Sequence, residues 1–272
     1  MAPHEAPRGG RQIGLVLGKP PRRGTLLAEL RDLLTHRGIQ VRVHLPHDGG
    51  EAAPDWLLDM ELIIQRGLGP DALDALQSVE RAGVVCCNAV TSTAALRDRL
   101  AVDRRLAAAG VPVPVSVAAT TWAQVREISA GRTAVIKARD GSRGRGRGVL
   151  LAVEGRLPEA APFPGPFLVQ DFVPGDGRDR KLYQAGRHLR GLLKQGTADA
   201  DHGGRAEQFR PDPSYGHLAA ATGRALGLDV FGVDLIAAPE GPRVVDVNAF
   251  PGFRGVPEAA RLVADHVLTL IP

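Results

Sequence analysis

The chain has 272 residues, of which 44% are hydrophobic, so it can build a sizeable core in about two domains. Its formal net charge of +4 favours an anionic ligand, but the excess is too small to require a nucleic acid. No stretch approaches the roughly 18 apolar residues that a membrane span needs, so we expect neither a membrane nor a nucleic acid as a partner.

Residues 1–10 are rich in proline and glycine and lack the apolar core of a signal peptide, so we predict a disordered tail there. The cysteines, Cys86 and Cys87, are adjacent in an apolar segment. Neighbouring residues of a strand point to opposite faces, which disfavours a disulfide between them. Free cysteines often pack as small apolar residues, and a reducing cytoplasm is the location that fits best.

The next part of the chain, 11–110, alternates short apolar strands with amphipathic helices. We expect strands at 13–17, 41–45, 62–65 and 84–87, and helices at 25–37, 71–82 and 93–109, the first of them capped by Thr25. Strands alternating with helices predict an α/β domain with a doubly wound parallel sheet. Pro112 and Pro114 cannot continue a helix, so we place the end of this domain at Gly110.

The pattern changes after this break to short strands joined by Gly/Pro turns. We expect strands at 134–138, 149–153, 167–172, 181–185 and 188–193, a helix capped by Ser214 that runs to Leu226, and a closing helix at 257–270. Runs of strands with helices beside them predict an α+β, mainly antiparallel arrangement. We divide this part into a central lobe, 111–165, and a C-terminal lobe, 166–272.

Two apolar segments near the end of the chain, each interrupted by a carboxylate, flank a turn and predict a β-hairpin: 231–236 and 244–252. Gly241 suits the left-handed residue of a three-residue loop. With Glu240 at the centre of the turn, Asp234 lies directly opposite Asp246, and Asn248 shares their face. Oxygen ligands of this kind suit Mg²⁺. The alternative is an exposed edge hairpin with alternating polar residues.

Lys137 ends an apolar strand just before a glycine-rich loop, 140–148. Glycines let backbone N–H groups approach phosphate oxygens closely, and the lysine adds a positive charge from a rigid strand. The loop is neither a P-loop nor a dinucleotide fingerprint, because a second strand follows it and no helix. A phosphate-covering hairpin is the favoured interpretation, and a flexible RNA-binding segment is the alternative.

The segment Phe167–Pro174 predicts a contact with a nucleotide base. Its backbone could bind the base edge while Gln170 or Asp171 reaches polar atoms of the base. An ordinary core strand that ends in a proline turn explains the pattern equally well. Downstream polar residues on neighbouring strands could join such a site or be surface charges: Asp179, Lys181 and Lys194.

The order of these motifs resembles the ATP-grasp superfamily over residues 11–270, and most closely its RimK-type carboxylate–amine ligases. The resemblance implies an ATP-grasp fold, in which two α+β lobes clasp ATP after the N-terminal domain. It also implies that Lys137 binds phosphates, that 142–148 forms a mobile flap, and that a pair of Mg²⁺ ions, with Mn²⁺ as an alternative, is bound. The metal ligands would be Asp234, Asp246 and Asn248.

The same resemblance implies the residues that contact the nucleotide and the substrates. Those expected at ATP are Arg99, Lys137, Ser142, Gly144, Gly146, Gly148, Gln170, Asp171, Phe172, Val173, Asp179 and Lys181. The expected catalytic residues are Lys137, Lys194 and Arg254. Arg254 and the arginines of the flap (Arg143, Arg145 and Arg147) could bind an acidic acceptor, because guanidinium matches carboxylate or phosphate geometry.

Some residues depart from the family pattern. Arg99 stands where lysine is usual and Asp246 where glutamate is commoner, and both keep the charge. The stretch 196–204 lacks an expected Asn-containing loop, which leaves the acceptor site open. The segment 246–253 is also similar to inositol polyphosphate kinases of the same superfamily, although Gln65-Arg66 replaces their His-Lys pair.

We therefore predict an ATP-dependent ligase that forms an amide or peptide bond through an acyl phosphate and releases ADP and phosphate. An inositol-phosphate-type kinase and an inert nucleotide-binding regulator are the alternatives. The expected partners are small-molecule or peptide carboxylate and amine substrates, and enzymes of this kind often assemble as homodimers or homotetramers.

Overall fold

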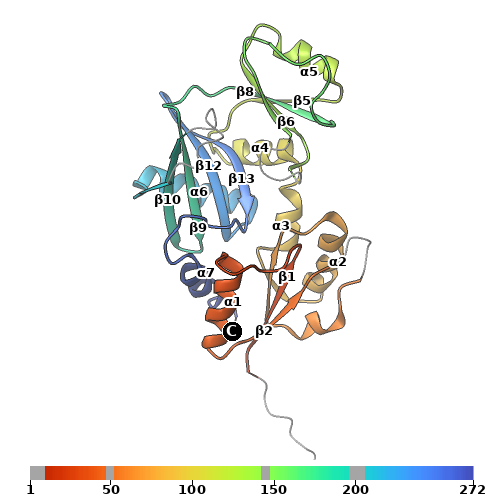
Figure 1. Cartoon of the computed structure of the whole chain (residues 1–272), viewed down its shortest axis with the longest axis vertical. Coiled ribbons are helices and arrows are strands. Elements are labelled where there is room, and N and C mark those ends of the chain that lie inside the picture. The colour runs from red at the N-terminus through yellow and green to blue at the C-terminus, as the bar shows by residue number, and fades with distance from the viewer. Residues whose placement is uncertain (1–9, 47–51, 142–147, 196–205, 272) are drawn as a thin grey trace, which may run out of the picture.

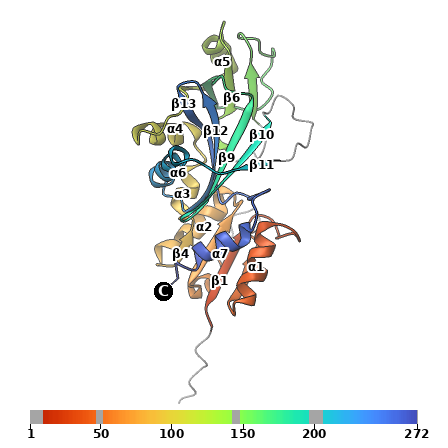
Figure 2. The same cartoon turned by 90° about the vertical axis from the view of Figure 1, so that its left-hand side faces the viewer.

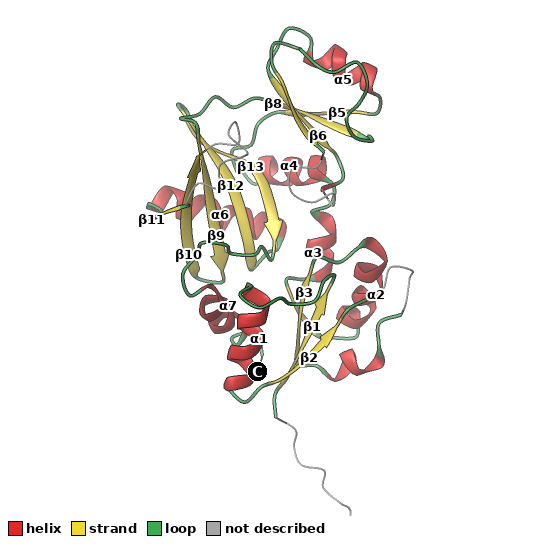
Figure 3. Cartoon of the chain, viewed as in Figure 1, coloured by secondary structure: helices red, strands yellow, loops and turns green. Residues whose placement is uncertain are grey.

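The computed structural model describes residues 10–46, 52–141, 148–195 and 206–271. Three sheets follow one another along the long axis of the molecule, with an N-terminal unit at one end and a central lobe at the other (Figures 1 and 2). The C-terminal sheet lies between them (Figure 3). Within the described residues, every helix is too short or too polar to span a bilayer.

The N-terminal unit contains the predicted parallel sheet, with strand order β2-β1-β3-β4. Its elements are β1 (Gln12–Leu17), α1 (Leu26–His36), β2 (Gln40–His44), a 3₁₀ helix (Asp55–Asp59), β3 (Leu62–Arg66), α2 (Pro70–Arg81), β4 (Val85–Cys87) and α3 (Val90–Ala95). Successive residues of β1 supply two cores: Leu15 and Leu17 pack on the side of α1, whereas Val16 packs on the side of α2. Both cysteines are free thiols, as expected.

The single helix expected at 93–109 is wrong, because two helices occupy this region: α3 and α4 (Arg99–Ala108). Asp98 separates them as the N-cap of α4, where its Oδ1 accepts from the backbone N–H groups of Leu100 (3.0 Å) and Ala101 (3.3 Å). An aspartate in this position satisfies donors that a continuous helix would have bonded itself. The start of α4 is therefore fixed by the side chain of Asp98.

The central lobe is a four-stranded antiparallel sheet with one helix on its face. Its elements are β5 (Ser116–Ala119), α5 (Trp122–Ser129), β6 (Ala134–Ala138), β7 (Val149–Ala152) and β8 (Phe167–Asp171). β5 and α5 were not predicted; α5 begins with a capping box between Thr121 and Gln124. Because β8 pairs with β5 and β6, we propose to end the central lobe at residue 171 and not at 165.

The C-terminal lobe is a five-stranded antiparallel sheet with strand order β11-β10-β9-β12-β13. Its elements are β9 (Arg178–Ala185), β10 (His188–Gln195), β11 (Glu207–Phe209), α6 (Pro213–Leu226), β12 (Val230–Ala238), β13 (Gly241–Ala249) and α7 (Ala259–Val267). The N-cap of α6 is Asp212 and not Ser214, since the Asp212 carboxylate accepts from the N–H groups of Ser214 and Tyr215. The closing helix is shorter than expected, and β11 was not predicted.

The N-terminal unit and the C-terminal lobe share one hydrophobic core. Leu15 of β1, Leu30 of α1 and Val263 of α7 belong to the same buried cluster as Tyr183 of the C-terminal sheet. Figures 1 and 2 both show α7 beside α1. The central lobe has a separate core around Ile136.

Asn88 joins the same two parts through hydrogen bonds. It follows β4, is fully buried, and accepts at Oδ1 from the backbone N–H groups of Asp229 and Val230, both at 2.8 Å. Its Nδ2 donates to the Val230 carbonyl at 2.7 Å. The amide thus satisfies the polar groups at the start of β12.

Asn88→Ala should lower the free energy of unfolding by about 3 kcal/mol, because it leaves buried backbone groups without partners. Urea denaturation followed by circular dichroism would measure the change. Gln40→Ala, at an exposed position on β2, is the control and should change stability by less than about 0.5 kcal/mol. Equal small effects of both substitutions would contradict the role of Asn88.

Candidate nucleotide and metal site

The β12–β13 hairpin places Asp234 directly opposite Asp246, as predicted. The turn itself differs from the prediction. Ala238 lies opposite Gly241, which has φ +114°, so the loop has two residues and not three. The expected register is restored by a β-bulge: Leu235 lies opposite Val244, which makes Val245 the extra residue of β13.

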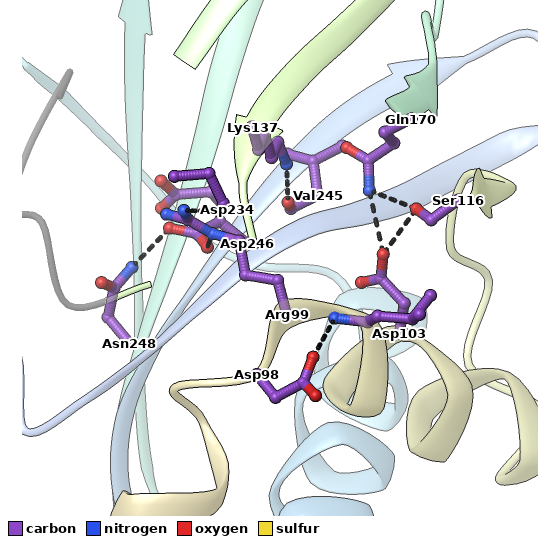
Figure 4. Close-up of polar contacts among 12 residues, drawn as sticks. Asp98, Arg99, Asp103, Ser116, Lys137, Gln170, Asp234, Val245, Asp246 and Asn248 are labelled. Atoms are coloured by element: carbon purple, nitrogen blue, oxygen red, sulfur yellow. Dashed lines mark hydrogen bonds and ion pairs between the residues drawn. The ribbon is translucent and has the colours of Figure 1, made fainter. Parts of the chain in front are cut away.

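The bulge provides the link between the two sheets that border the site. An extra residue in a bulge is left out of the regular ladder, and the Val245 carbonyl instead accepts from Nζ of Lys137 at 2.8 Å (Figure 4). Lys137 belongs to β6 of the central lobe and is 8% exposed. Burial lowers the pKa of Lys137, and the nearby carboxylate of Asp246 opposes this effect.

Lys181, Asp234 and Asp246 lie directly opposite one another on β9, β12 and β13, and we call them the charged row. Lys181 donates to the Asp234 carboxylate. Burial raises the pKa of Asp234, and the charge of Lys181 opposes this. Asn248, two residues beyond Asp246, donates from Nδ2 to Asp246 Oδ2 at 3.1 Å.

Arg99, the first residue of α4, approaches Asp246 of the charged row. Its Nε lies 3.9 Å from Asp246 Oδ1, and its Nη1 donates to the Ala138 carbonyl at 2.9 Å. Arg99, which the resemblance places at ATP, therefore sits between the end of β6 and the hairpin.

The side-chain oxygen atoms of Asp234, Asp246 and Asn248 fit a hard cation such as Mg²⁺. Two opposed carboxylates and an amide share one face, and the Asp246 side chain is 35% exposed, so it can accept a further partner. Across the described residues, no group of three or more His, Cys, Asp or Glu side chains converges on a common point. An ion here would therefore need other oxygen atoms, and phosphates are the usual partners of Mg²⁺.

A network that the sequence did not predict lies on the other side of Lys137 (Figure 4). Asp103 Oδ2 accepts from Ser116 Oγ at 2.6 Å and from Gln170 Nε2 at 3.2 Å. Burial raises the pKa of Asp103, while the bond from Ser116 and the charge of Lys137 act in the opposite direction. A signal existed: Asp103 is four residues after Arg99, so both occupy one face of α4.

The strand that precedes the glycine-rich loop is tied to the start of α4. Arg139 donates from Nε to Asp98 Oδ1 (3.0 Å) and from Nη2 to Asp98 Oδ2 (2.6 Å). This pairing lowers the pKa of Asp98. Gly148, at the other end of the loop, has φ +74° and accepts from Ala138 N–H. Arg139 was not among the predicted site residues, although it stands between Lys137 and the glycine-rich loop.

The structure brings together many of the predicted residues, but not all. One cleft is lined by Arg99, Lys137, Gln170, Asp246 and Asn248, together with Asp103.

Other predicted residues do not line this cleft. Asp171 pairs with Arg132 at 2.7 Å, on the face of β8 opposite to Gln170. Phe172 is 43% exposed, and Val173 is half-buried beside it. Asp179 is half-buried on β9, and Lys194 lies opposite it in the strand register. The residues predicted for the flap at 142–147 (Ser142, Gly144, Gly146 and the three arginines) and the stretch 196–204 lie outside the described residues.

The segment after β13 folds back over the sheet face that carries the charged row. A Cβ placed on Gly232 would lie 3.2 Å from Cγ of Pro251, so a side chain there would press on the proline. Phe253 packs on Tyr183 with 5.1 Å between ring centroids. Gly232 lies opposite Tyr183 in the register, immediately beside the charged row. The segment therefore forms one wall next to the row.

Two arginines converge on this wall. A Cβ placed on Gly252 would lie 3.2 Å from Nη2 of Arg66 and 3.9 Å from Cγ of Arg254. Arg66 is the last residue of β3, at the carboxyl end of a parallel sheet, which is where such sheets bind ligands. Arg254 is exposed in the loop. Side chains of two arginines from distant parts of the chain thus lie near Gly252, Arg66 with its guanidinium and Arg254 with its aliphatic stem.

Comparisons with known proteins agree with this geometry. The sequence profile of a family described as the inositol 1,3,4-trisphosphate 5/6-kinase ATP-grasp domain matches residues 191–269. A probable alpha-L-glutamate ligase of Trichodesmium erythraeum (strain IMS101) is 30% identical over 199 residues, which cover 68% of this chain and 66% of that protein. Another, of Xanthomonas campestris pv. campestris (strain 8004), is 29% identical over 201 residues, covering 66% of this chain and 67% of that protein.

Solved structures extend the similarity to nearly the whole chain. A RimK domain ATP-grasp protein from Sphaerobacter thermophilus superposes with a TM-score of 0.69 at 24% identity, covering 94% of this chain and 99% of that one. The ATP-grasp ligase PsnB, complexed with a minimal precursor, Mg and ADP, gives 0.68 at 19% identity, covering 95% and 96%. The predicted fold class is confirmed, and so is the ligase type of enzyme. The chain belongs to the ATP-grasp superfamily and is RimK-like within it.

Proposed function

We propose that the chain is an ATP-dependent carboxylate–amine ligase that forms an amide bond through an acyl phosphate, with release of ADP and phosphate. The observation that carries this proposal is one cleft in which Asp246 and Asn248 of the hairpin face Lys137 and Arg99, with Asp234 directly opposite Asp246 on the next strand. The relatives named alpha-L-glutamate ligases support it and suggest L-glutamate as one substrate. A peptide acceptor is suggested by the precursor peptides bound to the PsnB ligase.

The first step is transfer of the γ-phosphoryl group to a carboxylate oxygen. The new P–O bond forms to that oxygen while the bond to the β-phosphate oxygen breaks, and ADP leaves. Asp234, Asp246 and Asn248 would hold Mg²⁺, which when bound offsets the negative charge of the phosphates. Positioning and charge neutralisation are the main contributions that a protein makes to this chemistry.

Lys137 is suited to hold the nucleotide phosphates. An ammonium group has three donors, so Nζ can keep its bond to the Val245 carbonyl and still donate to a phosphate oxygen. Arg99 supplies a second positive charge from α4. Both cations are held by backbone carbonyls, so they lose little freedom when a nucleotide binds.

The second step joins the amine to the activated acid. The amine nitrogen attacks the acyl carbon, the bond from that carbon to the phosphate oxygen breaks, and phosphate leaves as the nitrogen loses a proton. We place the acceptor carboxylate between the charged row and the wall at Gly252, where Arg66 and Arg254 can bind it. Lys194 lies opposite Asp179 in the register, on the side of the charged row away from Gly232, and it stays a candidate catalytic residue outside this region.

A phosphoryl transfer to a hydroxyl group is the second candidate function. The kinase-type profile matches 191–269, which includes the whole hairpin and α7. Both functions share the first step, and they differ in whether the phosphorylated product is an anhydride that an amine can attack.

Incubation with ATP, Mg²⁺ and hydroxylamine should distinguish them. With L-glutamate or peptides ending in glutamate as acceptors, we expect ADP and an acyl hydroxamate in equal amounts, because hydroxylamine captures an acyl phosphate. Asp246→Asn is the negative control and should form neither. ADP accompanied by a stable phosphate ester of an inositol phosphate, without hydroxamate, would instead establish a kinase.

Lys137→Met should weaken ATP binding by about 10- to 100-fold, because it removes a charge-assisted hydrogen bond at nearly constant volume. Isothermal titration with ATP would measure the change. Lys19→Met, at an exposed position after β1, is the matched control and should bind ATP like the unaltered protein. Wild-type affinity of the Lys137 variant would contradict its phosphate role.

Arg66→Ala should raise KM for the carboxylate substrate about tenfold or more, with little change in KM for ATP, since a guanidinium–carboxylate contact is lost. Arg254→Ala should act in the same direction. Steady-state ADP release would give both constants, with Arg31→Ala on the surface of α1 as the control. If KM for ATP alone rose, the arginines would belong to the nucleotide and not to the acceptor.

A further inference from the structure

Gln170 presents an ambiguous group to the nucleotide cleft. A glutamine amide has a donor end and an acceptor end that differ little in shape, so its neighbours must decide which end faces a ligand. Gln170 is 2% exposed, lies on β8 and lines the cleft with Lys137 and Leu168. Its orientation therefore determines what kind of polar atom the cleft can recognise there.

The partners of Gln170 fix its orientation. Nε2 donates to Asp103 Oδ2 and to Ser116 Oγ, both at 3.2 Å. The Ser116 hydroxyl gives its single proton to Asp103 Oδ2 at 2.6 Å, so it can offer Gln170 only a lone pair. An ionised carboxylate likewise only accepts. A reversed amide would place Oε1 against these acceptors, and the observed orientation is therefore enforced.

The carbonyl end of Gln170 consequently points away from Asp103 and Ser116. Figure 4 shows it on the side of the amide that faces Lys137. The same view places this network to one side of Lys137 and Arg99, and Asp234, Asp246 and Asn248 to the other. If the phosphates of a nucleotide lie at the charged row, its base lies toward Gln170.

We propose that Asp103 is a positioning residue for base selectivity, which holds the Gln170 amide so that its carbonyl oxygen accepts from the amino group of adenine. Guanine carries a carbonyl oxygen at the same position of the ring and would meet a second acceptor. The inference rests on a nucleotide occupying the cleft, but it does not depend on whether the product is an amide or a phosphate ester.

Binding of non-hydrolysable ATP and GTP analogues tests the proposal separately from catalysis. The unaltered protein should prefer the adenine analogue. Asp103→Asn can present either a donor or an acceptor to Gln170, so the amide is free to reverse. We expect the ratio of the two dissociation constants to fall about tenfold or more, and Asp74→Asn on the surface of α2 should leave the ratio unchanged.

A second substitution distinguishes orientation from general damage to the site. In the double variant Asp103→Asn/Gln170→Glu, residue 170 can only accept and the new amide at 103 can donate to it, so selectivity for adenine should return. A thermal melt confirms that each variant is folded. Equal weakening of both analogues by Asp103→Asn, or a double variant that remains unselective, would overturn the proposal.

Discussion

The hydrogen bond from Lys137 to the Val245 carbonyl is the contact on which the arrangement of the site depends. It joins the sheet of the central lobe to the sheet of the C-terminal lobe, and the carbonyl is available because one extra residue interrupts the β13 ladder. The same bulge sets the register that places Asp234 opposite Asp246. A single irregularity thus aligns both carboxylates and the lysine that faces them.

The charges of the cleft stabilise one another in a partly buried environment. Desolvation acts against the charged form of Lys137 and of Asp234, and neighbouring opposite charges act in favour of it. Lys137 is within the influence of Asp103, Asp234 and Asp246 at once. The side chains of the site therefore behave as one electrostatic unit, and the effects of substitutions within it are not expected to be additive.

Sequence patterns predicted the features that depend on local periodicity and strand pairing. The parallel sheet, most strands and the opposition of Asp234 and Asp246 followed from alternating apolar residues and a turn. The three-residue loop was wrong because a two-residue turn and a bulge shift the chain by compensating amounts, which no pattern in 231–252 indicates. The alternation also gave no signal for β5, α5 and β11, which are short and partly exposed.

Side chains that meet only through tertiary packing were harder to find. Asp103, Ser116 and Gln170 come from α4, β5 and β8, and their proximity follows from how the central lobe sits over α4. Arg66 and Arg254 are similarly far apart in sequence and meet at Gly252. The Asp171 side chain was predicted at the base, but it lies on the other face of β8 because strand neighbours alternate.

The shared core of α1, β1 and α7 changes the mechanical division of the molecule. The described residues form three sheets, yet the N-terminal unit and the C-terminal lobe cannot separate without exposing a hydrophobic cluster and breaking the bonds of Asn88. The central lobe packs around its own core and is connected through short segments at 111–115 and 172–177. The N-terminal unit and the C-terminal lobe therefore form one continuous body, and the central lobe, which carries Lys137, is held to it by side-chain bonds such as those of Lys137 with Val245 and of Arg139 with Asp98.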